Sequence, residues 1–297
     1  MRADLHVHSS ASDGTEPPAE VMRRAAQAGL DVVALTDHDT VAGHAEARRA
    51  LADSLADPLA SSLTLLPGME LSCRLGDRSR EVPGGSPSRG QHSVHLLAYL
   101  FDAGHPDLAA ELSRIRDDRV LRARAMVDRL ADLGVGIGWD QVAAIAGPAV
   151  VGRPHIARAM AASGAIASPR EAFTRDWIGD GGRAYVGRYA LDPVHAIGLV
   201  RDAGGVAVLA HPRAGRDWVV SDEEIGRLAA AGLAGVEVFH PDQAAAERAR
   251  LLALAHDLGL VATGGSDDHG SLTGHRIGSE TVAADAYQAL ISRAAGI

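Results

Sequence analysis

Short apolar runs alternate along the chain with longer, Ala-rich stretches. The apolar runs, such as Val32–Thr36 and Val206–His211, predict buried strands. The Ala-rich stretches predict helices; Pro18–Ala28, for example, has Pro17 just before it and Gly29 just after it. Strands that alternate with helices are typical of parallel α/β architecture. Strands are expected at Ala3–His8, Val32–Thr36, Leu63–Glu70, Val94–Phe101, Val206–His211, Gly235–Phe239 and Leu260–Gly264, and helices at Pro18–Ala28, Gly43–Ala52, Ala109–Leu133, Pro193–Ala203, Asp222–Ala231 and Gln243–Leu258.

Two segments interrupt this alternation. Gly76–Gln91 is polar and rich in Gly, Pro and Ser, which predicts a mobile hairpin tip or loop insertion. Residues 103–189 are mostly helical in pattern, with no convincing strand. We therefore expect a barrel domain formed by residues 1–102 and 190–297, and an inserted helical, substrate-binding domain at 103–189.

Composition places the chain among soluble globular proteins. Of its 297 residues, 46% are hydrophobic and 23% are charged. No apolar run approaches the roughly 20 residues of a membrane span, and the opening MRADLHVHSS lacks the apolar core of a signal peptide. The single cysteine, Cys73, excludes an internal disulfide framework and reads as a small core residue. A cytoplasmic location is expected.

The net charge and the types of basic residue exclude several classes of binding and catalytic site. The net charge of -9 argues against broad coating of nucleic acid, although it leaves room for a small basic pocket. The chain has no lysine, so all 29 basic residues are arginines. A P-loop, a Schiff base and a carbamylated lysine that bridges two metals are therefore excluded.

Metal-ligating residue types recur where the predicted strands end. His6 and His8 are two positions apart, so they share a strand face while Leu5 and Val7 pack behind them. Polar ligand types at the carboxyl ends of parallel strands are typical of a barrel active site. The candidates are His6, His8, Asp37, His38, Asp39, Glu70, His95, His211, His240, Asp242, Asp267, Asp268 and His269.

The types of ligand indicate which ions would bind. Imidazole and carboxylate without thiolate suit Mn, Fe or Zn, and this many ligands predict two or three divalent ions rather than one. Such clusters bind phosphoryl oxygens and generate hydroxide. A lone histidine near a strand end is usually structural. The metal site is predicted because ligand types recur at the ends of successive strands. Surface or packing roles are expected for His44, His92, His105, His195, His256 and His275.

Six motifs resemble the polymerase and histidinol phosphatase (PHP) family of metal-dependent phosphoesterases. They are DLHVHSSASDGT, ALTDHDT, GMELSC, HLLAY, LAHP and GGSDDH, and they span residues 4–269. The resemblance implies a distorted seven-stranded (β/α) barrel. Within the family, the layout is similar to nucleoside 3',5'-bisphosphate phosphatases, which carry a helical insertion with an Arg-rich helix and a G-R-P-H-like segment. Here these are Arg119–Arg124 and Gly152–His155.

The resemblance also implies a ligand set for three ions, with Glu70 as a bridge and manganese as the expected metal. The first ion would be held by His6, His8, Glu70 and Asp267, the second by Glu70, His95 and His211, and the third by Asp13, His38 and His269. No family ligand position is substituted in this chain. The long Gly76–Gln91 insertion is the departure from the family pattern, and its role is open.

The expected mechanism is in-line attack on phosphorus by an activated water, without a covalent intermediate. His155 or Arg153 would contact the phosphate or the departing oxygen, and Asp37 and Asp39 would orient His38. Arg119 and Arg122, three apart, share a helix face suited to a second phosphate; the alternative is a solvated face paired with nearby Asp. The catalytic candidates are His155, Arg153, His38 and Asp37, and the substrate-binding candidates are Arg119, Arg122, Arg124, Arg153, His155 and His240.

The predicted reaction removes the 3'-phosphate from a nucleoside 3',5'-bisphosphate such as pAp, and the same site could trim short RNA in the 5'-3' direction. The partner is thus a small phosphorylated nucleotide or short oligoribonucleotide, with no membrane and no obligate protein partner.

Three alternatives to this function stay open. A histidinol-phosphate phosphatase needs one phosphate pocket and no Arg-rich helix. Many metallo-amidohydrolases need the lysine that this chain lacks. A non-catalytic metal-binding module typically loses ligands.

Overall fold

The computed structural model describes residues 1–53, 62–76, 92–147, 151–215 and 218–295. The chain forms two compact units. The first unit contains residues 1–75, 92–110 and 191 onward, and the second contains residues 111–190. Residues 77–91 of the expected loop insertion lie outside the described residues.

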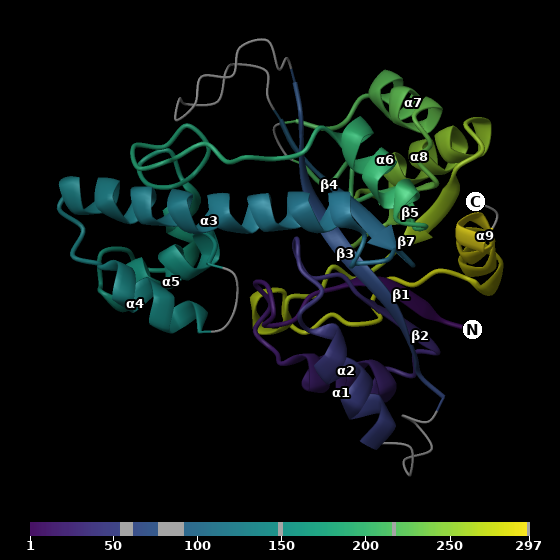
Figure 1. Cartoon of the computed structure of the whole chain (residues 1–297), viewed down its shortest axis with the longest axis horizontal. Coiled ribbons are helices and arrows are strands. Elements are labelled where there is room, and N and C mark those ends of the chain that lie inside the picture. The colour runs from purple at the N-terminus through teal and green to yellow at the C-terminus, as the bar shows by residue number, and fades with distance from the viewer. Residues whose placement is uncertain (54–61, 77–91, 148–150, 216–217, 296–297) are drawn as a thin grey trace. The chain divides into compact units, whose positions relative to one another are not determined.

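The first unit is built on one curved sheet (Figure 1). In the described residues its seven strands pair in chain order. A parallel bridge between Val7 and Asp268, just beyond the last strand, brings the two edges together into a nearly closed barrel. This confirms the expected fold class. The strands are β1 (Ala3–Val7), β2 (Val32–Leu35), β3 (Thr64–Leu75), β4 (His92–Tyr99), β5 (Val206–Leu209), β6 (Gly235–Phe239) and β7 (Val261–Gly264).

Strand β4 runs against its neighbours. It pairs antiparallel with both β3 and β5, so the expectation of parallel strands is wrong at this position. Parallel neighbours need a crossover, usually a helix, and the sequence places no helical pattern between β3 and β4. Strand β3 also continues past its expected end at Glu70 to Leu75. The hairpin pairs Ser72 with His95, which places His95 close to the same barrel end as Glu70.

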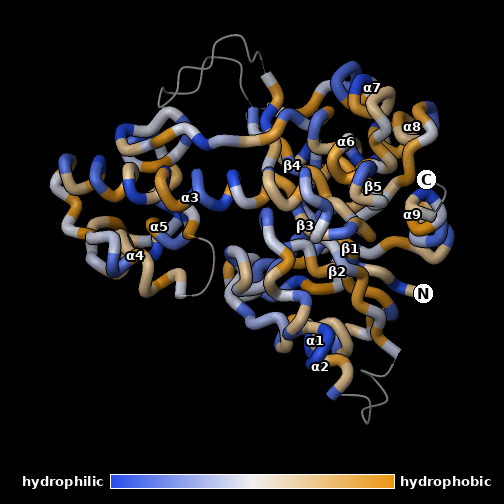
Figure 2. The backbone as a smooth tube through the Cα atoms, in the orientation of Figure 1, coloured by the Kyte–Doolittle hydropathy of each residue, from blue (hydrophilic) through white to orange (hydrophobic). Residues whose placement is uncertain are grey.

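Alternating side chains fill the barrel. Val32 and Ala34 on β2 and Val206 and Val208 on β5 belong to one buried apolar cluster, which Leu290 of the C-terminal helix also joins. Figure 2 shows the apolar character of these strands. Each fully buried Val or Leu contributes about 1.5–3 kcal/mol. On β3, Leu66 belongs to this cluster and Glu70 lies further along the same strand face, so the apolar layer lies beneath a polar one there.

Helices cover the outside of the barrel. Val21 and Met22 of α1 pack in a cluster with Val33 and Leu35 from the outer face of β2. None of the helices in the described part of the chain combines the length and apolarity needed to cross a membrane. The helices of the first unit are α1 (Pro18–Gln27), α2 (His44–Asp53), α6 (Pro193–Asp202), α7 (Asp222–Ala230), α8 (Ala245–Asp257) and α9 (Ala284–Ala295), with a 3₁₀ turn η3 (Gly270–Leu272).

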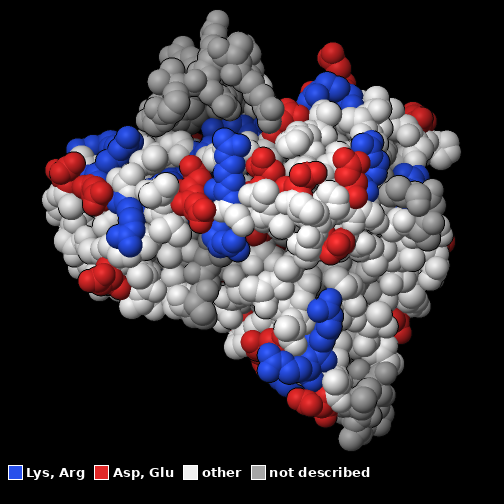
Figure 3. Space-filling view, viewed as in Figure 1, with Lys and Arg blue, Asp and Glu red and all other residues white. Residues whose placement is uncertain are grey.

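The second unit is helical and has its own core. Met126, Leu130, Ile156 and Met160 are fully buried in a single apolar cluster that lies within this unit. Helix α3 begins in the first unit and continues into the second. Figure 3 shows acidic and basic side chains interspersed on the face in view. The elements are α3 (Pro106–Asp132), α4 (Trp139–Ala146), α5 (Arg153–Ala162) and the 3₁₀ turn η2 (Pro169–Phe173).

Loss of His44 is expected to destabilise the first unit in a pH-dependent way. His44 is buried, and its Nε2 donates towards Gly68 O at 2.9 Å and Leu35 O at 3.1 Å. His44→Ala removes both of these buried hydrogen bonds, at a cost of about 1–3 kcal/mol. Burial lowers the pKa of His44, so its stabilisation is complete above the unfolded pKa near 6.5 and shrinks as the pH falls.

Urea unfolding in EDTA at pH 8 and pH 5.5 measures this effect. The stability gap between the wild type and His44→Ala should be wider at pH 8. His256→Ala is the control, because that side chain is exposed and should change neither value. A gap of equal size at both pH values would contradict the assignment.

Candidate metal centre

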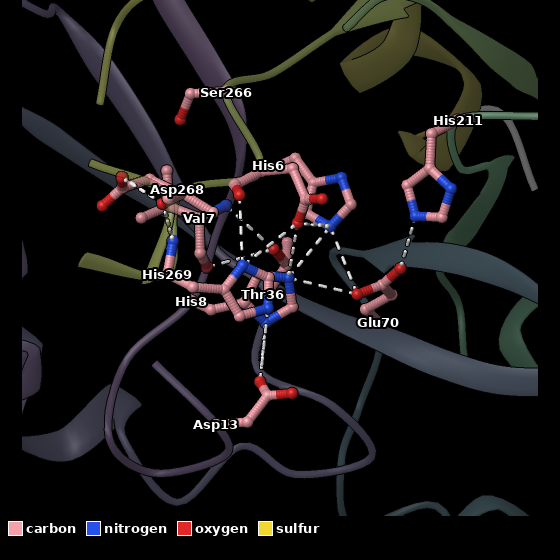
Figure 4. A network of polar contacts seen from close by, with 12 residues as sticks. His6, Val7, His8, Asp13, Thr36, Glu70, His211, Ser266, Asp268 and His269 are labelled. Carbon is pink, nitrogen blue, oxygen red and sulfur yellow. Dashed lines mark hydrogen bonds and ion pairs between the residues drawn. The ribbon is translucent and has the colours of Figure 1, made fainter. Parts of the chain in front are cut away.

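The predicted ligands converge at one end of the barrel. Figure 4 shows six of them, namely His6, His8, Asp13, Glu70, His211 and His269. The side chains come from β1 and from the segments that follow β1, β2, β5 and β7, with two more on the β3–β4 hairpin. Ligand atoms within 4.8 Å of one another form three groups among the described residues. The groups are His6, His8, Glu70 and Asp267; His8, Asp13, His38 and His269; and His38, Glu70 and His95.

Glu70 occupies the centre of this cluster. It is 1% exposed, and its Oε2 lies 3.2 Å from His6 Nε2 and 3.1 Å from His8 Nε2. Its other oxygen, Oε1, lies 2.7 Å from His95 Nδ1 and 3.1 Å from His211 Nε2. The two oxygens therefore face different sets of imidazoles, which is the arrangement that a bridging carboxylate needs.

Two aspartates complete the cluster. Asp267 Oδ1 lies 3.4 Å from His6 Nε2 and 3.2 Å from His8 Nε2. Asp13 Oδ1 lies 3.4 Å from His269 Nε2, on the other side of the His8 ring. The predicted third set omitted His8, which the geometry adds to it.

The donor atoms fit divalent metal ions. His6 Nε2 and His8 Nε2 lie 3.0 Å apart and both face carboxylate oxygens. The buried Nδ1 of His8 has no hydrogen-bond partner among the described residues. Converging imidazoles and carboxylates without thiolate are a ligand set for Mn, Fe or Zn. This centre therefore binds divalent metal.

Backbone strain gathers around the same centre. Asp39, His211 and Asp267 adopt positive φ angles of 53°, 26° and 48°, which non-glycine residues rarely do. Each such residue costs on the order of 1–3 kcal/mol and persists where its surroundings fix it. Two of the three are predicted ligands, so the fold holds them in orientations that a relaxed backbone would not give.

Several residues support the ligands, and two of them were not singled out in the sequence. Glu237 on β6 is fully buried and accepts from His6 Nδ1 at 3.1 Å. Asp4 accepts from the backbone N–H groups of Ser266 and Gly278. Burial raises the pKa of Asp4 to about 6. An acidic residue inside an apolar strand, as in GVEVF, is the signal that could have identified Glu237.

The other predicted polar residues of the first unit take clear positions. Asp37 accepts from Ser9 N, Ser9 Oγ and Ser12 Oγ at 2.6–2.8 Å, so it anchors the loop that carries Asp13. His240 is buried and lies 3.2 Å from Asp267 Oδ2, while its Nδ1 accepts from Asp242 N. Its Nε2 therefore donates to Asp267, a predicted ligand.

Charge coupling shifts the pKa of the ligands in opposite directions. Burial alone would lower the pKa of His6 and His8, but the nearby carboxylates raise it, well above its usual range for His6 and to about 10 for His8. Burial would raise the pKa of Glu70, yet the surrounding imidazoles hold it well below its usual range. Burial lowers the pKa of His38 to about 3. The carboxylates are thus ionised, as anionic ligands must be.

Metal binding is expected to weaken as the pH falls. With raised pKa values, His6 and His8 hold protons at neutral pH that a divalent ion must displace. Protonation competes increasingly at lower pH, so the apparent affinity should drop by up to about tenfold per pH unit for each displaced proton. Manganese titration at pH 6.5 and 8.5 measures the affinity, and calorimetry in buffers of different ionisation enthalpy counts the protons released. Equal affinities at both pH values would contradict the prediction.

The remaining candidates lie in the second unit. Arg122 is 9% exposed, and its Nε donates to Val186 O at 2.7 Å. Arg153 pairs with Asp180 at 2.8 Å. Arg124 stacks over Trp139, with its guanidinium carbon 4.1 Å from the ring centroid. His155 is buried, and its Nδ1 accepts from Gly152 N at 2.9 Å.

A barrel whose end gathers imidazoles and carboxylates around the buried Glu70 has the ligand set of a metal-dependent hydrolase. Residues 4–103 match the model of the PHP domain family. The chain is 34% identical over 275 residues to a 3',5'-nucleoside bisphosphate phosphatase of Chromobacterium violaceum, covering 92% of this chain and 89% of that protein. The chain belongs to the PHP family of metal-dependent phosphoesterases.

Other relatives carry different activities on phosphate esters. A phosphoribosyl 1,2-cyclic phosphate 1,2-diphosphodiesterase of Eggerthella lenta is 31% identical, with 91% of this chain and 95% of that protein covered. A 5'-3' exoribonuclease of Haemophilus influenzae is 32% identical, with 90% and 89% covered. A metal-dependent phosphoesterase structure from Bifidobacterium adolescentis superposes with a TM-score of 0.85 at 32% identity, covering 98% of this chain and 96% of that one. This chain is thus a hydrolase of phosphate esters.

Proposed function

We propose that this protein removes the 3'-phosphate from nucleoside 3',5'-bisphosphates such as pAp. The observation that carries the proposal is a buried arginine in the second unit with an unused donor. Nη2 of Arg122 is buried and has no hydrogen-bond partner among the described residues. A buried guanidinium donor of this kind matches a phosphate oxygen.

Other arginines gather around Arg122. Burial and the positive charge of Arg153 lower the pKa of Arg122 to about 9, with smaller effects from Arg188 and Arg119. The guanidiniums of Arg122 and Arg153 lie 5.5 Å and 5.7 Å from the centre of the Tyr185 ring. Repulsion between the buried Arg122 and its neighbouring arginines is relieved by a bound anion. A substrate with two phosphates supplies one phosphate for cleavage and another for this cluster.

The metal centre supports cleavage of the ester. Divalent ions held there supply Lewis acidity and a nucleophile generated from water at neutral pH. We propose two or three ions, because the three ligand groups share His8, Glu70 and His38. Manganese is proposed first among Mn, Fe and Zn. Glu70 keeps the ligand groups together, Asp37 fixes the Asp13 loop, and His240 orients Asp267 through its hydrogen bond.

His155 and Arg153 suit contact with a phosphate or a departing oxygen. Because His155 Nδ1 accepts from Gly152 N, the ring proton of the neutral imidazole is on Nε2. Arg153 Nη1 donates to Asp180, so one nitrogen of its guanidinium already has a hydrogen-bond partner within the protein. We propose that both contact the substrate, with Arg119 and Arg122 holding the uncleaved phosphate.

Trimming of short RNA is a second candidate. The similarity to an exoribonuclease over 90% of this chain favours it, and the same arginine cluster would hold a 5'-phosphate. The relative that hydrolyses a cyclic phosphate adds a diester to the substrates worth testing.

A grid of metals and substrates tests the proposal. Purified protein loaded with Mn, Fe or Zn is given pAp, a 5'-phosphorylated tetraribonucleotide, a ribose 1,2-cyclic phosphate and histidinol phosphate. We expect the highest kcat/KM with Mn and pAp, with AMP and inorganic phosphate as products. Faster turnover of histidinol phosphate, or release of the 5'-phosphate, would refute the substrate assignment.

A further inference from the structure

Glu237 is a buried charge on an otherwise apolar strand. It lies on β6 within the sequence GVEVF and is 0% exposed. Burial of a carboxylate is costly unless its oxygens are hydrogen-bonded. The two oxygens of Glu237 have separate partners, namely His6 Nδ1 for Oε1 at 3.1 Å and His211 N for Oε2 at 2.8 Å.

The first contact selects the tautomer of His6. A carboxylate only accepts, so the ring proton of His6 lies on Nδ1. Nε2 faces Glu70 Oε2 at 3.2 Å and Asp267 Oδ1 at 3.4 Å, so a metal that displaces the second proton of the imidazolium would leave the neutral ring protonated on Nδ1, with the Nε2 lone pair free to bind. This is the tautomer that lets His6 act as a metal ligand through Nε2.

The second contact holds the backbone of His211. This residue has a φ of 26°, which is unfavourable for a side chain with a Cβ. Glu237 Oε2 accepts from its N–H, and the ring of His211 then reaches Glu70 Oε1 at 3.1 Å. One carboxylate thus fixes an imidazole on each side of Glu70, because His6 approaches Oε2 and His211 approaches Oε1.

We propose that Glu237 is a positioning residue that couples the two metal positions on either side of Glu70. It sets the Nε2 ligand of His6 for one position and the place of the His211 ring for the other. The inference rests on the metal centre of the proposed function, but it is independent of which phosphate ester is cleaved. Loss of Glu237 should therefore weaken both positions together.

Glu237→Gln tests this with little change in volume. An amide has one accepting oxygen, so its NH₂ group must face either His6 or His211 N. Facing His6, it donates to Nδ1 and moves the ring proton to Nε2, where it blocks a metal. We expect the affinity for manganese, measured by competition with a chelator, to fall about 10–100-fold at both positions beside Glu70.

The tautomer gives a signature that a general loss of stability would not produce. In ¹⁵N-histidine spectra of the zinc-loaded wild type, His6 should show a protonated Nδ1 and a metal-bound Nε2. In Glu237→Gln that pattern should be lost for His6, whose signals are assigned with a His6→Gln variant.

Thr263→Val is the matched control. Thr263 pairs with Glu237 on the neighbouring strand β7, is 1% exposed, and its Oγ1 has no hydrogen-bond partner in the described part of the chain. This variant should bind manganese like the wild type. If Glu237→Gln does not fold, Glu237→Asp keeps the charge but draws the oxygens back, and a smaller loss of affinity is expected.

Two results would overturn the proposal. One is wild-type manganese affinity with an unchanged His6 tautomer in a folded Glu237→Gln or Glu237→Asp variant. The other is an equal loss of affinity in Thr263→Val. Because the assays use metal alone, failure of the pAp assignment would leave their outcome unaffected.

Discussion

Glu70→Gln is expected to reduce phosphate release from pAp by at least about 10³-fold, equivalent to about 4 kcal/mol of lost transition-state stabilisation. Glu70 lies within 3.2 Å of five imidazole nitrogens, so its charge holds the whole cluster together. The amide keeps the shape but removes the negative charge and turns one acceptor into a donor. Steady-state kinetics with manganese and metal content per chain measure the effect.

Met69→Leu is the control for this change. Met69 is the preceding residue on β3, points to the opposite strand face and is fully buried. A swap of similar volume should cost less than about 1.5 kcal/mol of stability and leave turnover intact. If Glu70→Gln kept a full complement of metal and more than a tenth of the wild-type rate, Glu70 would not be the bridge.

Local periodicity predicted much of the barrel. The two-residue spacing of His6 and His8 places both rings on one strand face, and the structure has them 5.0 Å apart between ring centroids. The same spacing in Asp267 and His269 follows β7, where the chain leaves the sheet. Such features depend on a few neighbouring residues, so the sequence pattern carries them. The ligand assignments drawn from family resemblance remain predictions until metal is located.

Contacts between distant segments could not be predicted in this way. Asp4 accepts from the backbone of Ser266 and Gly278, and these bonds tie the first strand to the segment after the last one. Asp37 was expected to orient His38, but the bonds described for its carboxylate go to Ser9 and Ser12. The hydrogen-bond partners of these carboxylates become neighbours only when the barrel closes. The local sequence pattern therefore does not predict them.

Helical periodicity predicted only in part which arginines of α3 lie together. Arg119 and Arg122 are three apart, and Arg119 adds to the positive field on Arg122. Arg124 lies roughly 200° further round the helix from Arg122. Its guanidinium instead stacks 4.1 Å over Trp139, a favourable cation–π contact. The spacing thus separates Arg124 from the cluster around Arg122, and substrate binding by that cluster stays a prediction.

Arg122→Met is expected to slow cleavage of a substrate with two phosphates and to leave cleavage of a substrate with one phosphate nearly unchanged. The variant removes the buried guanidinium whose Nη2 lacks a partner in the described residues. Hydrogen bonds between charged groups contribute about 1.5–3 kcal/mol, so kcat/KM for pAp should fall about 10–100-fold. Hydrolysis of p-nitrophenyl phosphate, which has one phosphate, should stay within about twofold. The comparison uses both substrates with the same manganese-loaded preparation.

Arg116→Met is the matched control, because Arg116 is an exposed arginine on the same helix whose Nη2 bonds only Ser113 Oγ among the contacts described. It should change neither activity. Ligand-induced stabilisation gives an independent measure: a bound bisphosphate satisfies Arg122 in the wild type, so pAp should raise Tm more in the wild type and Arg116→Met than in Arg122→Met. An equal loss on both substrates would mean that Arg122 supports the fold or the metal centre instead. Unchanged pAp kinetics in Arg122→Met would mean that the arginine cluster does not bind the substrate. The physical reason for proposing a bisphosphate substrate would then be lost.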